Sequence, residues 1–317
     1  MAKTKTKTKR AAPARVQSPR PARPRHQRDW PFWLAAAVPF VLAGALGIFL
    51  VSQRDAGSTA DLPPASTLPA TPDYHSLLVG PANPDRLWLG THAGLHESTD
   101  GGRSWAETGL AGRDAMNLAR SPGGAKTVWA AGHLVFAKST DGGESWADVS
   151  PRGLPSLDIH GFATDPRNPQ TLWAAVVGEG LFRSRDGGRS FALVSSQVGP
   201  GVMALGVRPD GRVLAGDMQQ GLMSSKDGGE SWTQVLAEGP MGLAINPRTP
   251  SQVLATGQSG IWSSSDGGST WRIVHPVLDG AGPVAWAPSA PATAYAVGFD
   301  RMLYKTENAG VSWRPVS

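Results

Sequence analysis

The feature that most constrains this chain is an eight-residue segment that occurs six times and ends each time in an aromatic residue. The copies cover residues 98–105, 139–146, 184–191, 225–232, 264–271 and 306–313, and the first reads Ser-Thr-Asp-Gly-Gly-Arg-Ser-Trp. We call this segment the octapeptide. Its aspartate, or the asparagine that replaces it in the sixth copy, recurs at intervals of 41, 45, 41, 39 and 42 residues. Repeats of this length are typical of propellers and solenoids.

Alternation of apolar and polar residues divides each repeat into four short strands. In the first repeat we expect strands at residues 75–79, 86–90, 95–98 and 104–108, the last two joined by the Gly-Gly turn of the octapeptide. A helical solenoid is excluded because the chain contains 39 Gly and 27 Pro. We therefore predict an all-β fold, a six-bladed β-propeller of four-stranded antiparallel blades, over residues 74–317. No strand is left over to lock the ring, so closure must depend on packing between blades unless the preceding linker supplies a strand.

The residues before the repeats predict a membrane anchor. Residues 1–29 form a basic, disordered tail that holds ten of the thirty Lys and Arg residues. Residues 30–51 contain no charged side chain and would span about 33 Å as a helix, enough to cross a bilayer. Residues 52–73 are a Pro/Ser/Thr-rich linker, expected to be extended and poorly packed.

The positive charge before this transmembrane helix places the N-terminus in the cytoplasm. We thus predict a single-pass type II membrane protein with a signal-anchor and an extracytoplasmic, periplasmic propeller. A cleaved signal peptide is the alternative, but its apolar region would be about 7–15 residues long. From Asp29 onward the 25 acids outnumber the bases by five, so nucleic acid is not a predicted partner. The chain has no cysteine, which excludes disulfides and thiolate chemistry.

The octapeptides resemble the Asp-box, or BNR, repeat, S-x-D-x-G-x-[TS]-W. Five copies match closely, and the sixth carries Asn308 and Ala309 in place of the Asp and the first Gly. The resemblance covers residues 75–317 and implies a β-propeller similar to those of sialidase-like proteins and of the photosystem II assembly factor. It also implies that the octapeptides are structural turns remote from the ligand face, with aspartates that take no part in catalysis.

A glycosidase related to the sialidases would need residues that we do not find. The resemblance implies a Phe/Tyr-Arg-Ile-Pro segment, three arginines and a tyrosine nucleophile, whereas this chain has no such segment. Its tyrosines are Tyr74, Tyr295 and Tyr304, and the last is expected in an outer part of its blade. Asp158 and Asp217 are the nearest candidates for the pair of carboxylates that glycoside hydrolysis requires. Arg183, Arg185 and Arg189 cluster at the third octapeptide, and we interpret them as a solvated face.

Alignment of the blades on their octapeptides draws attention to the opposite face of the ring. There the first strand of each blade begins and the second ends. The first strands begin at His75, Met116, His160, Met203, Met241 and Gly282, and the second strands end at His92, His133, Val177, Met218, Gln258 and Phe299. Imidazole and thioether groups without thiolates or a nearby ring of carboxylates are ligands that suit copper. We therefore predict a metal site at the channel mouth, formed by His75, His92, His133, His160, Met116, Met203, Met218 and Met241.

The alternative is a structural role, in which the methionines fill the channel and the histidines occupy turns, leaving a polar pocket for a small ligand. His96 and His275 fall outside the register and are expected at the surface. The function we favour is a membrane-tethered, non-enzymatic binding or assembly module whose His/Met face looks toward the bilayer and a membrane-protein partner. The alternative function is an exported glycoside hydrolase of the sialidase-like type.

Overall fold

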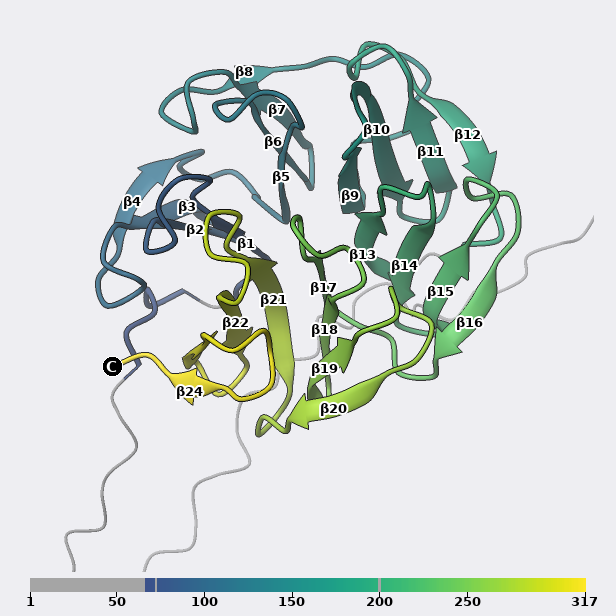
Figure 1. Ribbon diagram of the computed structural model, residues 1–317. Coiled ribbons are helices and arrows are strands. Elements are labelled where there is room, and N and C mark those ends of the chain that lie inside the picture. Colours follow the sequence, from purple (N-terminus) through teal and green to yellow (C-terminus); the bar gives the residue numbers. More distant parts are fainter. Residues whose placement is uncertain (1–65, 72, 199–200) are drawn as a thin grey trace, which may run out of the picture. The chain divides into compact units, whose positions relative to one another are not determined.

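Six four-stranded antiparallel sheets make up the fold, and each is one continuous stretch of chain. The computed structural model describes residues 66–71, 73–198 and 201–317. These residues belong to one compact unit, residues 61–317. In Figure 1 the sheets stand as blades around a centre, with their first strands innermost and their fourth strands at the rim. The predicted all-β, six-bladed propeller is confirmed for this part of the chain.

The strands of the first three blades have the following bounds. Blade 1 contains β1 (Ser76–Val79), β2 (Leu87–Thr91), β3 (Gly94–Ser98) and β4 (Ala106–Gly109). Blade 2 contains β5 (Asn117–Arg120), β6 (Val128–Gly132), β7 (Val135–Ser139) and β8 (Ala147–Asp148). Blade 3 contains β9 (Ile159–Asp165), β10 (Asn168–Val176), β11 (Gly180–Ser184) and β12 (Ala192–Ser195).

The other three blades repeat this arrangement. Blade 4 contains β13 (Val202–Val207), β14 (Val213–Asp217), β15 (Gly221–Ser225) and β16 (Thr233–Leu236). Blade 5 contains β17 (Gly242–Ile245), β18 (Val253–Gly257), β19 (Gly260–Ser264) and β20 (Arg272–His275). Blade 6 contains β21 (Ala281–Trp286), β22 (Ala294–Gly298), β23 (Leu303–Thr306) and β24 (Arg314–Pro315).

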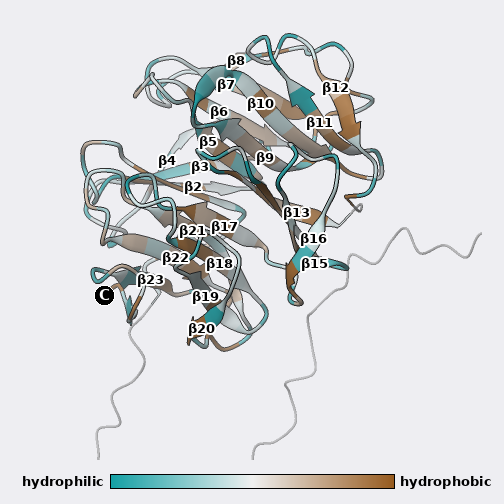
Figure 2. Cartoon of the chain, turned by 45° about the vertical axis from the view of Figure 1, so that its right-hand side comes forward, coloured by the Kyte–Doolittle hydropathy of each residue, from teal (hydrophilic) through white to brown (hydrophobic). Residues whose placement is uncertain are grey.

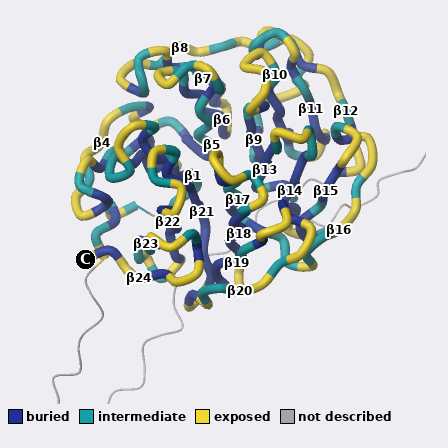
Figure 3. Tube along the Cα trace, viewed as in Figure 1, coloured by how far each residue is buried: buried dark blue, intermediate teal, exposed yellow. Residues whose placement is uncertain are grey.

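The hydrophobic core lies between the blades. There are six clusters of buried apolar side chains, and each combines residues from two adjacent blades. The second strands β2, β6, β14, β18 and β22 are buried along their whole length, whereas the fourth strand β4 is largely exposed. Figure 3 shows this gradient from dark blue inner strands to a yellow rim, and in Figure 2 β13 and β21 are among the brown, apolar segments. A single sheet is apolar on both faces here, so it needs a neighbour on each side.

The octapeptide forms the turn between the third and fourth strands, as predicted. In the first copy, Asp100 Oδ1 accepts hydrogen bonds from the backbone N–H groups of Arg103 and Ser104, at 2.9 and 3.0 Å. Gly101 and Gly102 have φ angles of 77° and 92°, a region that favours glycine. The same pattern recurs in the later copies, including the sixth, where the Ser312 N–H donates to Asn308 Oδ1 at 2.9 Å. The carboxylate therefore organises its own turn and faces no ligand.

Each octapeptide also touches the blade before it. A Cβ added at Gly102 would lie 2.1 Å from Leu303 Cδ2 of blade 6, and one at Gly268 would lie 3.1 Å from Leu214 of blade 4. The closing aromatic residue packs at the same junction: Trp105 lies against the cluster shared by blades 6 and 1. The structure thus places this residue between two blades. The second position of the turn requires glycine because the neighbouring blade occupies the space that a side chain would need.

Among the described residues, the ring closes by contacts between complete blades, without an exchanged strand. Every blade supplies its own four strands, and β1 contacts β21 as the other innermost strands contact their neighbours. The cluster at this seam includes Leu77, Leu87, Tyr295 and Leu303 from blades 1 and 6. Leu68, from the predicted linker, is only 7% exposed and joins the same cluster. The last residues of the linker thus contribute packing to the closure but no strand, because Leu68 lies outside the strands of the sheets.

Within residues 66–71, 73–198 and 201–317, no helix is long and apolar enough to cross a membrane. The predicted tail, residues 1–29, and the predicted transmembrane helix, residues 30–51, lie outside the described residues.

Candidate functional site

The start of the first strands and the end of the second strands share one face of the ring, and the histidines of blades 1 to 3 meet there. His75 Nε2 lies 3.1 Å from His92 Nδ1, and His133 Nε2 lies 2.9 Å from His160 Nε2. Between these pairs, the rings of His92 and His133 are stacked with their centroids 5.8 Å apart. The four histidines of the predicted site therefore form one continuous row across three blades.

Three aspartates lie in the same row. Asp73 contacts both His75 and His92, Asp114 lies between His92 and His133, and Asp158 lies between His133 and His160. We call this set the arc; its residues are Asp73, His75, His92, Asp114, His133, Asp158 and His160. The face of the ring that carries it is the arc face. Our expectation of a site without nearby carboxylates was wrong, because it considered only the first residue of each innermost strand and the last residue of each second strand.

The aspartates have a sequence signal that explains their position. Each stands two residues before the predicted start of an innermost strand, as in Asp73-Tyr-His75, Asp114-Ala-Met116 and Asp158-Ile-His160. In extended chain, residues two apart point to the same side. The aspartate side chain therefore lies at the same rim as the first side chain of the strand, close to His92 or His133, each of which follows a second strand. Asp73 and Asp114 also accept a backbone hydrogen bond from His92 and His133, at 3.2 and 3.4 Å.

The arc is half-open to solvent, and the histidines at its two ends are its most buried imidazoles. The side chains of His75 and His160 are 17% and 20% exposed, against 44% for His92 and His133. Burial lowers the pKa of His75, and the neighbouring charge of His92 lowers it further. Burial likewise lowers the pKa of His160, although Asp158 opposes it. Both shifts favour the neutral ring, the form in which imidazole binds metals.

Asp73 remains ionised although it is partly buried. Burial alone would raise the pKa of Asp73, but hydrogen bonds with the side chain and backbone of His92 outweigh it and lower the pKa. The arc therefore presents a carboxylate beside neutral imidazoles. Such a set of nitrogen and oxygen atoms offers ligands to Zn²⁺, Cu²⁺ and similar divalent ions.

The methionines of the predicted site are divided between two places. Met116, Met203 and Met241 line a central cavity of about 100 Å³ together with His75. Met218 is 38% exposed and follows the end of β14 in a turn on the arc face. Three methionines thus line the channel, and none of the arc's nitrogen and oxygen contacts involves them.

The two histidines outside the register are also outside the arc. His96 in β3 and His275 in β20 are both half-buried, where we expected surface residues. His275 packs edge-on against Tyr304, with ring centroids 5.0 Å apart, which accounts for its burial.

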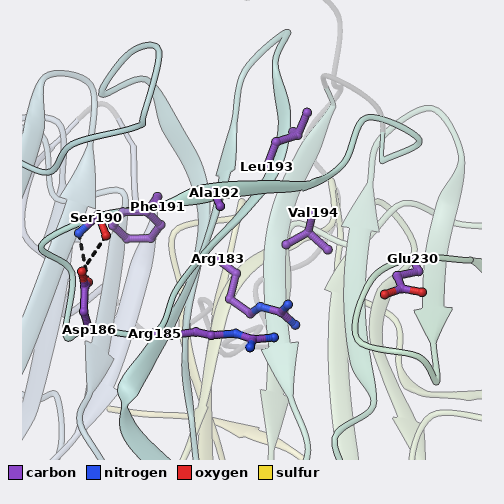
Figure 4. Close-up of a pocket in the computed structure, with 9 residues that line it drawn as sticks. All are labelled: Arg183, Arg185, Asp186, Ser190, Phe191, Ala192, Leu193, Val194 and Glu230. Atoms are coloured by element: carbon purple, nitrogen blue, oxygen red, sulfur yellow. Dashed lines mark hydrogen bonds between the residues drawn. The ribbon is translucent and has the colours of Figure 1, made fainter.

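A second candidate region is an open pocket of about 470 Å³ at the outer edge of blade 3, beside the third octapeptide. Arg183, Arg185, Leu193 and Glu230 are among the residues that line it, and Figure 4 shows the two guanidinium groups directed into one space. The Arg183 guanidinium also lies 5.0 Å from the ring centroid of Trp173, a cation–π contact that ties it to the blade. Burial lowers the pKa of Arg183, and the neighbouring Arg185 adds to the effect. The open position of the pocket is consistent with a solvated face.

The residues that a glycosidase would use are engaged elsewhere. Tyr295 donates a hydrogen bond to Asp85 Oδ1 at 3.2 Å and is fully buried, and Tyr304 donates to Asp300. Tyr74 donates to the Pro69 carbonyl at 2.7 Å. Asp217, one of the two candidate acids, is fully buried and caps a turn by accepting from the Gln219 N–H at 2.8 Å.

No protein-family model and no curated protein sequence matches this chain. Solved structures do match its fold. The GH74 xyloglucanase from Xanthomonas campestris is similar at a TM-score of 0.57 and 20% identity, over 77% of this chain and 45% of the enzyme. YCF48 bound to a D1 peptide is similar at a TM-score of 0.51 and 17% identity, over 76% of this chain and 81% of YCF48.

A third similar structure is the extracellular domain of a putative one-component system from B. thetaiotaomicron, with a TM-score of 0.52 and 11% identity, over 77% of this chain and 33% of that one. The chain spans less than half the length of the GH74 enzymes it matches. At these identities the likeness establishes the fold alone, so the class of protein is a six-bladed β-propeller with a His/Asp-rich channel mouth.

Proposed function

We propose that this protein is a membrane-tethered, extracytoplasmic propeller that binds a membrane-protein partner through the arc face and is not an enzyme. The observation that carries the proposal is the distribution of exposed apolar side chains. Among the described residues seven large apolar side chains are exposed, and four of them, Leu134, Met218, Leu278 and Phe299, lie in turns on the arc face. Exposed apolar groups gathered on a functional face are typical of surfaces that meet another protein.

The position of the predicted linker also favours the arc face as the binding surface. Asp73, the last residue of the predicted linker, belongs to the arc, and Ser66 donates a hydrogen bond to the Arg301 carbonyl in a turn on the arc face. The chain therefore enters the propeller across this face. If residues 30–51 span the membrane as proposed, the partner lies in or on the same bilayer.

The chemistry of the arc face favours binding over glycoside hydrolysis. Each arc carboxylate faces an imidazole nitrogen, so none stands as one of two opposed acids across an open cleft. Of the similar structures, YCF48 was solved with a peptide bound, which supports a peptide-binding role for this fold. The GH74 enzymes support the alternative, an exported glycoside hydrolase, and the experiments below separate the two.

The first experiment places a photo-reactive amino acid at one of three positions of the full chain in its native membrane. We expect substitution at Phe299 or Met218, each 38% exposed on the arc face, to yield a crosslink to the same membrane protein. Leu193, 55% exposed on the outer strand β12, is the matched control and should yield none. Equal crosslinking from Leu193, or none from either arc-face position, would contradict the proposal.

The second experiment tests catalysis directly. The purified full chain in detergent is incubated with fluorogenic sialosides and glucosides and with xyloglucan. We expect release of product no faster than in buffer alone. Robust turnover that disappears in an Asp158→Asn variant would replace the binding function with the hydrolase.

A further inference from the structure

We infer that the arc holds two divalent transition-metal ions in two separate sites, each formed by two histidines and one aspartate. Asp114 lies between the two sites and orients one histidine of each. The inner site consists of His133, Asp158 and His160, and the outer site of Asp73, His75 and His92. This inference does not depend on the proposed partner binding, since it concerns ligands within the chain.

The inner site has three ligand atoms that converge on one point. His133 Nε2 and His160 Nε2 are 2.9 Å apart, and Asp158 Oδ1 lies 3.3 and 3.1 Å from them. In a tetrahedral zinc site with bonds of about 2.0–2.1 Å, ligand atoms are separated by about 3.3 Å. The observed triangle matches one face of such a tetrahedron, and its fourth corner is open because His133 and Asp158 are 44% and 41% exposed.

The polar atoms of this triangle are only partly satisfied by one another, since the two imidazole nitrogens can share one hydrogen bond. Asp158 Oδ1 is buried and accepts no hydrogen bond, although two imidazole nitrogens lie within 3.3 Å of it. Two imidazole nitrogens at 2.9 Å need a proton or a cation between them, and a single proton can serve only one such contact. A metal ion would bind all three atoms at once.

The outer site repeats the arrangement within blade 1. His75 Nε2 lies 3.1 Å from His92 Nδ1 and 3.4 Å from Asp73 Oδ1, and Asp73 Oδ2 contacts His92 Nδ1. The two sites share no ligand, so both can be filled together. The sites differ in the ring nitrogen that ligates, since His92 would use Nδ1 and His133 would use Nε2, and the inner site joins blades 2 and 3.

Asp114 contacts the remaining nitrogen of both central histidines. Its Oδ2 lies 3.7 Å from His92 Nε2 and contacts His133 Nδ1. A carboxylate on the free nitrogen of a metal-bound histidine fixes the ring and makes it a better ligand. The side chain of Asp114 is 8% exposed, and its Oδ1 is buried without a hydrogen-bond partner, so this carboxylate is available for that role.

The ligand set selects the metal. Two imidazoles and a carboxylate suit Zn²⁺, Cu²⁺ and similar divalent ions, whereas Cu⁺ prefers the sulfur ligands that we expected from the methionines. The geometry therefore replaces the predicted His/Met copper set by two His/Asp sites. Among first-row ions, Cu²⁺ should bind more tightly than Zn²⁺.

The test is titration of the metal-free full chain, without an affinity tag, by Zn²⁺ in calorimetry. We expect two ions per chain. His160→Ala should lose the inner ion and His75→Ala the outer one, each leaving a stoichiometry of one, and a double variant of His92→Ala with His133→Ala, which also breaks the group His92, Asp114 and His133, should bind none. Asp114→Asn should keep two ions but bind both about 10–100-fold more weakly.

The matched control is Met203→Leu with Met241→Leu, which removes two channel thioethers at nearly constant volume. It should leave stoichiometry and affinity unchanged. Circular dichroism of every variant checks that the propeller is folded. The inference is overturned if the folded wild-type chain binds fewer than two ions, if the double histidine variant binds as the wild type does, or if the methionine control loses an ion. Crosslinking at Phe299 reports on the partner independently of these outcomes.

Discussion

At the scale of single residues, the octapeptide aspartates are charged groups held in place by their own turns. Asp141 accepts hydrogen bonds from the Ser145 and Ser139 hydroxyls and from the Ser145 N–H. The hydroxyl of Ser145 is the largest influence, and together these bonds lower the pKa of Asp141 far below its ordinary value of 3.8. Asp100, Asp186 and Asp227 are held in the same way by the serine four residues on.

These carboxylates make the stability of the propeller depend on pH. Because the pKa is lower in the folded chain, the unfolded chain takes up protons first as the pH falls. The stabilisation is complete above about pH 5 and decreases as the pH passes through the unfolded value near 3.8. We expect the urea midpoint to be lower at pH 3 than at pH 6.

Two reciprocal variants isolate this effect from other titrating groups. Asp141→Asn removes one titrating group in a form that the sixth octapeptide already accommodates, since Asn308 keeps the turn contacts with Ser312. It should lose less stability between pH 6 and pH 3 than the wild type, and Asn308→Asp should lose more. Identical losses in all three proteins would show that the octapeptide carboxylates do not contribute.

The arc shows what single residues reveal in sequence and what they do not. The positions of its four histidines followed from alignment on the octapeptides, because the alternation of a strand fixes where its ends lie. Asp73, Asp114 and Asp158 were missed as a set because each precedes its strand, in a segment without a regular pattern. Side-chain contacts across blades, such as Asp158 with His133, depend on how the blades pack and are not encoded in the spacing of one repeat.

At the scale of elements, the octapeptide is both a turn and a contact with the neighbouring blade. Gly102 and Gly142 have nearly equal φ angles, 92° and 95°, but only Gly102 faces a neighbour, Leu303, and Gly142 faces open space. Alanine at Gly142 should therefore cost only the backbone strain, about 1–3 kcal/mol. Alanine at Gly102 should cost about 1–3 kcal/mol more, because its Cβ would lie 2.1 Å from Cδ2 of the fully buried Leu303.

The comparison is made by urea unfolding of both variants under one set of conditions. Since the two positions share their backbone strain, the difference between them measures the contact with blade 6. Equal free energies of unfolding would mean that the seam yields to the added methyl group without cost.

Strand positions were predicted well where the turns carry glycine or the octapeptide, and less well elsewhere. In blade 3 the Pro and Asn residues at 166–169 are typical of a turn, but β10 begins at Asn168, which pairs with Asp165 of β9. The register shifts between Asn168 and Leu172, so the pairing resumes beyond an irregular stretch. Asp165 binds Arg167 within this turn, a local contact that a reading of Pro and Asn as loop residues does not anticipate.

At the scale of the whole molecule, closure depends on the cluster between blades 6 and 1. Leu68 precedes the first strand and is buried in this cluster, so we expect Leu68→Ala to reduce the free energy of unfolding by about 2–3 kcal/mol. Leu193→Ala, at a side chain that is 55% exposed, is the control and should change it by less than about 0.5 kcal/mol. Urea midpoints measure both. A midpoint of Leu68→Ala equal to that of Leu193→Ala would show that the segment does not help to close the ring.

The number of blades and closure without an exchanged strand both followed from the sequence, because the first and last repeats are complete. The burial of Leu68 did not, since a Pro- and Thr-rich segment gives no periodic signal. Its burial depends on a hydrophobic gap between two blades that lie at opposite ends of the repeat region.

Closure by complete blades has a consequence for how such a protein can change over generations. Each blade is one uninterrupted stretch of the gene and carries, in its octapeptide, the residues that contact the blade before it. One in-frame duplication or deletion of a repeat would therefore add or remove a finished unit together with its means of attachment. The arc is encoded within residues 73–160. A lineage could alter blades 4 to 6 in this way and inherit the segment that encodes the arc intact.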